Sequence, residues 1–362
     1  MTIAHTLTSG DYCSPEVFEA EKRQYFHGGW FMALRADTLR PGNRRVVEIA
    51  GESVLLARDL RNVIHAHANV CRHRGARLCE EDSSSTQGSL MCPYHAWTYA
   101  LDGTLIATPH LDNDEVDKSQ LSLWRIAVEV WQGFVFVCLS ATPPDFAAWM
   151  ALHCAELTAL ERYCFGDLEV AVTTRSDVAA NWKILVENYL ECLHCTRVHP
   201  ELVEIIPTYR SGWVWDRGRP DGGVTLKNRG NSFTLSGSSQ LPILPGLSEL
   251  DATTYFGCTA YPNMFVDVTG TSAIVTTMFP VGPALTRVVT EYMFAPETIA
   301  SAEFDPAPVV EFSELVAAQD YAVCERVQRG VSSKFFTAGV LTTKDDLVIA
   351  MTQHYLDTRE GH

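Results

Sequence analysis

The sequence predicts an α+β protein in which a small all-β domain is followed by a domain with an antiparallel sheet and a long C-terminal helix. Short runs rich in Val and Ile, separated by Gly, Asp and Asn, recur over residues 45–139. Further strand-like runs follow over 170–293, and one amphipathic segment then extends over 309–329. Strands that are grouped together before a long helix are typical of α+β domains.

In the first half of the chain we expect one helical region and then short strands. Residues 11–40 are predicted to be helical, with Ser14 as a candidate N-cap. Strands are predicted at 45–49, 53–58, 63–69 and 128–139. The segment Thr-Pro-Pro-Asp at 142–145 is typical of a domain boundary. We therefore expect three parts: residues 1–35 as an N-terminal helical part of the second domain, 36–145 as the small β domain, and 146–362 as the rest of the second domain.

In the second half we expect two helices, a group of strands and the long closing helix. The helices are predicted at 146–162 and 182–194, on either side of a strand at 170–177. Later strands are predicted at 212–215, 224–227, 264–268, 273–279 and 286–293. The closing helix over 309–329 is predicted to end at Gly330.

Composition excludes several classes of protein. The 362 residues suffice for two domains. The formal net charge is −16 with no basic stripe, so nucleic acid is not an expected partner. No apolar run reaches membrane-spanning length, and the first ten residues do not resemble a secretory signal. Eleven Cys, an odd number, argue against a disulfide framework and for a reducing, cytoplasmic location.

Two pairs of Cys and His form the most specific motif. Cys71 with His73 and Cys92 with His95 read C-x-H-x18-C-x2-H. A [2Fe–2S] centre with two Cys on one iron and two His on the other requires this set, and its imidazoles raise the reduction potential above that of an all-Cys cluster. The alternative is a structural zinc site, but zinc sites usually pair Cys with Cys and His with His. The pattern therefore favours an electron-relay cluster.

A second set of candidate ligands begins at the end of the predicted helix over 182–194. His194 and His199 are five apart, or about 140° on a regular helix, so they can share a metal only if the helix ends or bends between them. Pro200 predicts such a break, because the residue before a proline is driven out of the helical region. The alternative is two ordinary His residues at a helix end.

The third ligand of this set is predicted to be a carboxylate. Asp320 falls on the apolar stripe of the helix over 309–329, where a carboxylate needs a strong partner such as a metal. The alternative is a buried ion pair with an Arg. Asp177, Asp216 and Asp267 are weaker candidates, because each lies in a predicted strand or turn where solvent explains it. Two His and one carboxylate suit ferrous iron and leave positions open for O2.

These motifs resemble those of the Rieske non-haem iron ring-hydroxylating oxygenases, α subunit. C-R-H-R-G-A-R-L at 71–78 and C-P-Y-H-A-W-T-Y at 92–99 are similar to their Rieske domain, although the gap between the pairs is longer here. E-N-Y-L-E-C-L-H-C-T-R-V-H-P at 187–200 and Q-D-Y-A-V-C-E-R-V-Q-R-G at 319–330 are similar to their iron-binding segments. The resemblance implies a small all-β Rieske [2Fe–2S] domain and a helix-grip-like catalytic domain.

The resemblance also implies the ligands and the partners. The cluster ligands would be Cys71, His73, Cys92 and His95, and the Fe(II) ligands would be His194, His199 and Asp320. Glu191 matches the acidic residue that links the two metal centres, so that in a homotrimer it would join His194 to His95 of the partner subunit. O2 would be the co-substrate. Electrons would come from NAD(P)H through a separate reductase or ferredoxin, since no Gly-rich dinucleotide fingerprint follows a strand in this chain.

The substrate is predicted to be a small organic molecule. Glu191, where many relatives carry Asp, resembles the oxygenases of quaternary ammonium compounds such as carnitine and glycine betaine, which implies oxidative N-demethylation or C–N cleavage. A cation cage needs aromatic faces, and Tyr209, Trp213 and Trp215 are the candidates, the two Trp residues sharing one face of a predicted strand. The alternative for these rings is sheet core. The alternative reaction is hydroxylation or cis-dihydroxylation of an aromatic ring, by a mono- or dioxygenase.

Two classes outside the oxygenases also fit part of the sequence. A Rieske ferredoxin would need only the first motif and would be far shorter than this chain. A zinc-stabilised binding module would use the first motif without redox chemistry.

Overall fold

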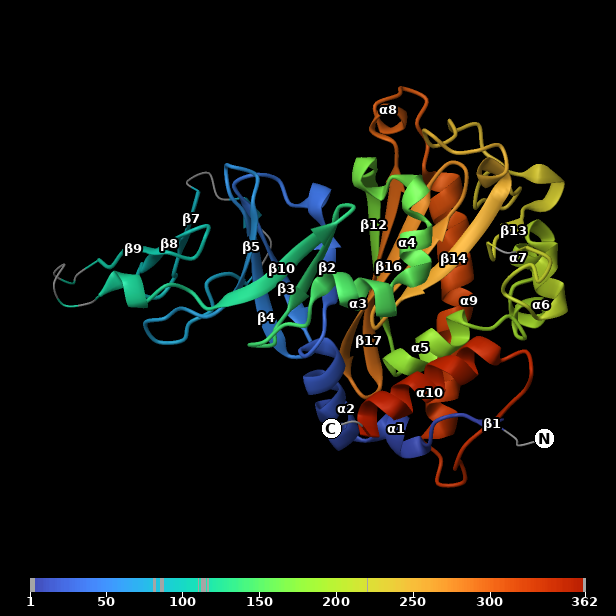
Figure 1. The fold of residues 1–362 in the computed structure, drawn as a ribbon, viewed down its shortest axis with the longest axis horizontal. Helices are drawn as coiled ribbons and strands as arrows, with labels where there is room; N and C mark the ends of the chain where they lie inside the picture. Colours follow the sequence, from blue (N-terminus) through green and yellow to red (C-terminus); the bar gives the residue numbers. More distant parts are fainter. Residues whose placement is uncertain are drawn as a thin grey trace. The chain divides into compact units, whose positions relative to one another are not determined.

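The chain forms two compact units (Figure 1). The computed structural model describes residues 4–80, 83–84, 88–109, 111, 115, 117–219 and 221–360. One unit is formed by Tyr25–Trp149, and the other by Met1–Gln24 together with Met150–His362. None of the helices in these described ranges is long and apolar enough to cross a membrane.

The first helical region is shorter than expected. Helices α1 (Ser9–Cys13) and α2 (Pro15–Glu21) lead into a π-helical turn, and Ser14 caps α2 by accepting from two backbone amides of its first turn. The chain then becomes strand β2 (Phe31–Arg35), which pairs antiparallel with β11 (Phe134–Cys138). The helix predicted over residues 11–40 is therefore wrong at 31–35, where β2 is buried along its whole length within the sheet, and a short 3-10 helix follows at Ala36–Thr38. The structure thus assigns residues 25–35 to the β unit, whereas the sequence suggested a boundary after residue 35.

The β unit contains two antiparallel sheets in its described part. The larger has the order β2-β11-β10-β5-β4-β3-β6, and the smaller has the order β7-β8-β9. Their further strands are β3 (Asn43–Ile49), β4 (Glu52–Arg58), β5 (Ile64–Ala68), β6 (Ser83–Ser84), β7 (Ser89–Met91), β8 (Thr98–Ala100), β9 (Leu105–Ala107) and β10 (Arg125–Trp131). The predicted single strand over 128–139 is a hairpin of β10 and β11, because Gln132 and Gly133 both have positive φ and turn the chain.

The larger unit is built on an antiparallel sheet of six described strands in the order β12-β17-β16-β15-β14-β13. They are β12 (Glu169–Val178), β13 (Val224–Thr225), β14 (Thr254–Ala260), β15 (Met264–Val268), β16 (Ala273–Gly282) and β17 (Leu285–Phe294). The long helix α9 (Ala307–Val331) runs beside the sheet, and helix α5 (Trp182–Tyr189) packs against α9 (Figure 1). Asn181 caps α5 by accepting from the backbone N–H of Lys183.

A buried ion pair connects three helices of this unit. The ammonium of Lys183 on α5 is fully buried and donates to Glu21 on α2. The same carboxylate accepts from the indole of Trp182 at 2.9 Å and from the hydroxyl of Tyr355 on α10 (Asp346–Glu360) at 2.7 Å. With three donors around it, the carboxylate is well satisfied, which is the condition under which a buried charge is tolerated.

Candidate metal centre

The chain breaks its helical path twice in the segment that carries the two predicted His ligands. Helix α5 ends at Tyr189, five residues before the predicted end. A single turn, α6 (Cys195–Val198), follows, and α7 (Pro200–Ile205) begins after His199, whose φ of −121° and ψ of 65° are not helical. The break predicted at Pro200 is confirmed, while the earlier one at the end of α5 was not predicted.

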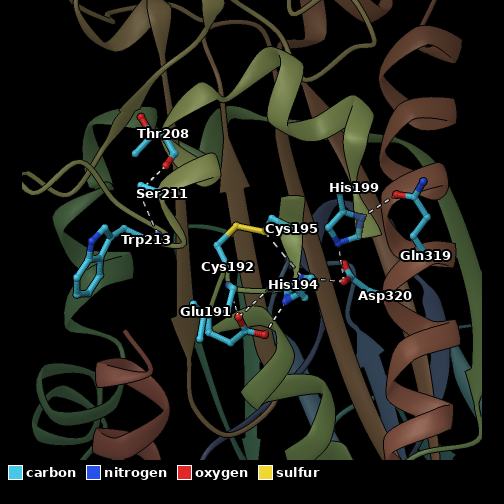
Figure 2. The surroundings of a disulfide bond; sticks show 11 residues. Glu191, Cys192, His194, Cys195, His199, Thr208, Ser211, Trp213, Gln319 and Asp320 are labelled. Atoms are coloured by element: carbon cyan, nitrogen blue, oxygen red, sulfur yellow. Dashed lines mark hydrogen bonds and ion pairs between the residues drawn. A yellow bond between two sulfur atoms is a disulfide. The ribbon is translucent and has the colours of Figure 1, made fainter. Parts of the chain in front are cut away.

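These breaks bring three side chains to one point. The candidate ligand atoms of His194, His199 and Asp320 all lie within 4.8 Å of one another. Nε2 of His199 lies 2.8 Å from Oδ1 of Asp320, and Nε2 of His194 lies 3.3 Å from the same oxygen. Figure 2 shows the two imidazoles directed at this carboxylate, which comes from α9. Residues 121 positions apart in the chain thus form one cluster.

The opposite nitrogen of each imidazole is held by an oxygen. Nδ1 of His194 lies 2.5 Å from Oε1 of Glu191, and Nδ1 of His199 lies 2.7 Å from Oε1 of Gln319 (Figure 2). Each of these oxygens can accept from Nδ1, so each ring is held with its Nε2 directed at Asp320. Two imidazole nitrogens and a carboxylate oxygen that converge on one point can share a cation, and imidazole ligands of metals are usually held through their other nitrogen in this way.

Electrostatics at this cluster indicate the same requirement. Burial lowers the pKa of His194, but the carboxylates of Asp320 and Glu191 more than offset this and raise the pKa to about 9. Burial raises the pKa of Asp320, and the two imidazoles reverse this and hold it below its usual value. The site therefore attracts positive charge. Two His and one carboxylate fit ferrous iron in type and number.

A disulfide closes the turn that carries two of these residues. Cys192 and Cys195 are joined, with their Cα atoms 5.0 Å apart, and Glu191 and His194 lie within or beside this small loop (Figure 2). Glu191 also accepts from the backbone N–H of Leu193. The sequence argued against a disulfide framework, and this local bond was not foreseen. It forms because the break after α5 folds two Cys three residues apart toward each other.

The two Cys–His loops of the β unit are built alike. The backbone N–H of Cys71 bonds to the carbonyl of Ala76 at 2.8 Å, and the amide of Cys92 bonds to the carbonyl of Trp97 at the same distance. In both loops the carbonyl of the Cys accepts from the amide four residues later, at 3.0 Å. Both Cys side chains are buried in one apolar cluster with Tyr99, whose hydroxyl lies 3.3 Å from Sγ of Cys71.

The imidazoles of these loops lie together. The rings of His73 and His95 have centroids 4.6 Å apart, and His73 also stacks on Trp97 at 4.7 Å. Nδ1 of His95 is shielded from solvent and has no hydrogen-bond partner among the described residues. A shielded nitrogen without a donor or acceptor fits a metal ligand, and two thiols beside two imidazoles fit a Rieske cluster.

A cavity of about 560 Å³ lies over the His194–Asp320 cluster, within the size range of small-molecule sites. Of the three candidate cage residues, Tyr209 and Trp215 line this cavity, and Trp213 is not among its described lining residues. The expected strand over 212–215 is wrong: a 3-10 helix ends at Ser211, Gly212 has φ 80°, and the chain turns. The two Trp rings consequently do not share a strand face. Figure 2 shows Trp213 well apart from the metal cluster.

Sequence reasoning missed two polar residues of this region. Gln319 orients His199, and its position beside Asp320 was the available signal. Asp267 was attributed to solvent, yet it lines the cavity and accepts hydrogen bonds from Tyr189 at 2.7 Å and Tyr255 at 2.5 Å. Its signal was a charged residue within the apolar run Met-Phe-Val-Asp-Val of β15.

Comparison with known proteins identifies the class. The family model described as ring hydroxylating alpha subunit (catalytic domain) matches residues 165–361, and the Rieske [2Fe-2S] domain model matches residues 29–130. The chain belongs to the ring-hydroxylating α-subunit family and carries a Rieske domain, so it is the oxygenase subunit of a Rieske non-haem iron oxygenase. The predictions of the fold, the enzyme class and the two kinds of iron cofactor are confirmed.

Individual relatives share limited sequence identity with this chain. The glycine betaine monooxygenase oxygenase subunit of Pseudomonas aeruginosa is 28% identical over 361 residues, which cover 91% of this chain and 82% of the relative. The carnitine monooxygenase oxygenase subunit of Escherichia coli is 28% identical over 343 residues, covering 91% and 85%.

Solved structures show the same fold. The quaternary ammonium Rieske monooxygenase CntA in complex with gamma-butyrobetaine has a TM-score of 0.78 at 24% identity, covering 99% of this chain and 96% of that chain. Naphthalene 1,2-dioxygenase from Rhodococcus sp. has a TM-score of 0.73 at 17% identity, covering 98% and 94%.

Proposed function

We propose that this chain is a terminal oxygenase for quaternary ammonium compounds, acting by oxidative N-demethylation or C–N cleavage. It would work as a cytoplasmic homotrimer that receives electrons from NAD(P)H through a separate reductase or ferredoxin. The main observation that supports this proposal is the cluster of His194, His199 and Asp320 beneath a cavity of about 560 Å³, which is lined by aromatic rings and carboxylates. Relatives named for glycine betaine and carnitine support this substrate class.

We assign the mononuclear iron to His194, His199 and Asp320, and the [2Fe–2S] cluster to Cys71, His73, Cys92 and His95. When bound, the mononuclear iron supplies O2 activation and the cluster supplies an electron. The chain's own contribution is orientation. Glu191 and Gln319 hold the Nδ1 protons of the two imidazoles, which fixes both rings with Nε2 toward the metal position.

Glu191 is also proposed as the link between metal centres of neighbouring subunits. Its carboxylate is partly buried and bonded to Nδ1 of His194 and to backbone amides of its own turn. A carboxylate held this firmly can accept a second imidazole without losing the first. We propose that the second imidazole is His95 of the partner subunit.

Substrate oxidation by the reconstituted enzyme tests the function. Glycine betaine, carnitine and choline should each be supplied with NADH, a reductase and O2, and product should be followed by mass spectrometry together with O2 uptake. We expect coupled formation of a demethylated or cleaved product from at least one of them. Uncoupled NADH oxidation with all three compounds, together with hydroxylation of naphthalene, would favour the aromatic alternative.

Iron analysis tests the assigned cofactors separately. The oxygenase assignment expects about three iron atoms and two labile sulfides per chain. A single zinc and no sulfide would contradict it.

A further inference from the structure

The cavity contains a partly buried carboxylate, Asp267, that is not part of the candidate iron site formed by His194, His199 and Asp320. Asp267 on β15 lines the cavity and accepts two hydrogen bonds on one oxygen, Oδ1, from the hydroxyls of Tyr189 and Tyr255. These tyrosines come from α5 and from the neighbouring strand β14. The arrangement holds a negative charge in a fixed position inside the substrate cavity.

The neighbouring strand β14 leaves room for the two tyrosine hydroxyls beside Asp267. Gly257 on β14 is the direct partner of Asp267 in the β14–β15 register. A Cβ at position 257 would lie 2.7 Å from the hydroxyl of Tyr189 and 3.0 Å from that of Tyr255, which is closer than side chains tolerate. The absence of a side chain at Gly257 therefore gives the two hydroxyls room to converge on one oxygen.

Apart from the proposed iron position, the cavity offers Asp267 little positive charge. Among the described lining residues, Arg162 is the one guanidinium or ammonium, and it bonds to Asp251 at 2.9 Å. Burial raises the pKa of Asp267 to about 6, although the two hydroxyls lower it, so the carboxylate is ionised at neutral pH but poorly compensated. A cationic ligand would relieve this imbalance.

Aromatic rings line the cavity together with Asp267. Tyr189 stacks on Phe265 with centroids 4.1 Å apart, Tyr255 stacks on Phe233 at 5.6 Å, and Tyr209 meets Tyr255 edge-on at 6.4 Å. All five rings line the cavity. Aromatic faces attract a cation without any hydrogen bond.

We propose that Asp267, held by Tyr189 and Tyr255, is the anionic part of a subsite that binds the positively charged nitrogen of the substrate. This inference rests on the proposed function and deepens it. Because the hydroxyls already occupy Oδ1, the subsite offers charge and ring faces rather than a free lone pair there. That combination suits a quaternary nitrogen, which has no N–H to donate, better than a primary amine.

The test compares a cation with its neutral isostere. Choline and 3,3-dimethylbutan-1-ol have the same shape and differ in the charge at the branched centre. Binding to the anaerobic, iron-loaded enzyme should be measured by isothermal titration calorimetry. We expect the wild type to bind choline at least tenfold more tightly than the neutral alcohol, or about 1.4 kcal/mol. Equal affinities would overturn the subsite without any variant being made.

The Asp267→Asn variant then assigns the charge to one residue. Asn can still accept both tyrosine hydroxyls, so the fold should be retained, which thermal unfolding and cluster absorption verify. We expect choline affinity to fall tenfold or more and affinity for the neutral alcohol to stay within threefold. A smaller loss for choline, or equal losses for both ligands, would overturn the proposal.

Glu156→Gln is the matched control, since Glu156 is another carboxylate of the same cavity. If any negative charge in the cavity favoured choline equally, both variants would lose the same choline affinity. The proposed subsite requires a larger loss of choline affinity in Asp267→Asn than in Glu156→Gln. Failure of the two proposals is distinguishable. Charge-selective binding without oxygenation of any ammonium compound refutes the function alone, and oxygenation with unchanged binding in Asp267→Asn refutes the subsite alone.

Discussion

The iron affinity of this enzyme should depend on Gln319, which is not itself a candidate ligand. Its Oε1 lies 2.7 Å from Nδ1 of His199, and its Nε2 donates to Glu201 at 3.2 Å, which fixes the orientation of the amide. The Gln319→Leu substitution removes the acceptor and keeps a side chain of similar size. His199 is 1% exposed, so water cannot replace the lost acceptor.

Two independent estimates of the free-energy cost of Gln319→Leu agree. A buried donor left without a partner costs about 1–3 kcal/mol. Loss of a group that orients a metal ligand typically lowers metal affinity about 10–100-fold, which corresponds to about 1.4–2.7 kcal/mol. We therefore expect Gln319→Leu to bind Fe(II) about 10–100-fold more weakly than the wild type.

Anaerobic competition of Fe(II) against a chelator measures this affinity, and the absorption of the Rieske cluster serves as the internal standard. Glu201→Gln is the control, because it leaves Oε1 of Gln319 on Nδ1 of His199 and keeps an oxygen to which the Gln319 amide can donate, so it should retain wild-type affinity. If Gln319→Leu keeps wild-type iron affinity while its cluster is intact, the argument that this hydrogen bond orients His199 is refuted.

Three further changes test other parts of the structure. Asp320→Ala should empty the mononuclear site and leave the cluster spectrum intact, and full iron content in that variant would mean that another carboxylate is the ligand. Lys183→Met should lower the free energy of unfolding by about 3–5 kcal/mol in urea titration, because it leaves Glu21 buried without its cation; an unchanged midpoint would contradict this. Replacing both Cys192 and Cys195 by Ser should cost about 2 kcal/mol of stability, as expected for so short a loop, and the difference from the wild type should vanish in strong reductant.

Local features of the sequence predicted most of the fold and the class of site. The Cys–His pairs could be recognised in the sequence because each pair lies within one short loop, whose conformation depends on neighbouring residues. The break before Pro200 was predictable because a proline restricts the residue that precedes it. Asp320 stood out because a charge on an apolar helical stripe is visible from periodicity alone.

Packing between distant elements decided the remainder. Gln319 and His199 are 120 positions apart, and Tyr189 and Asp267 are 78 apart, so their contacts follow from how α9, α7, α5 and β15 are assembled rather than from any local pattern. The same applies to Trp213, which a turn in place of a strand removes from the cavity. The sequence by itself determined which residues could bind iron, because ligand chemistry belongs to the residue. Only the tertiary structure decided which groups orient the candidate ligands and which carboxylates line the cavity, because hydrogen bonds and desolvation depend on three-dimensional neighbours.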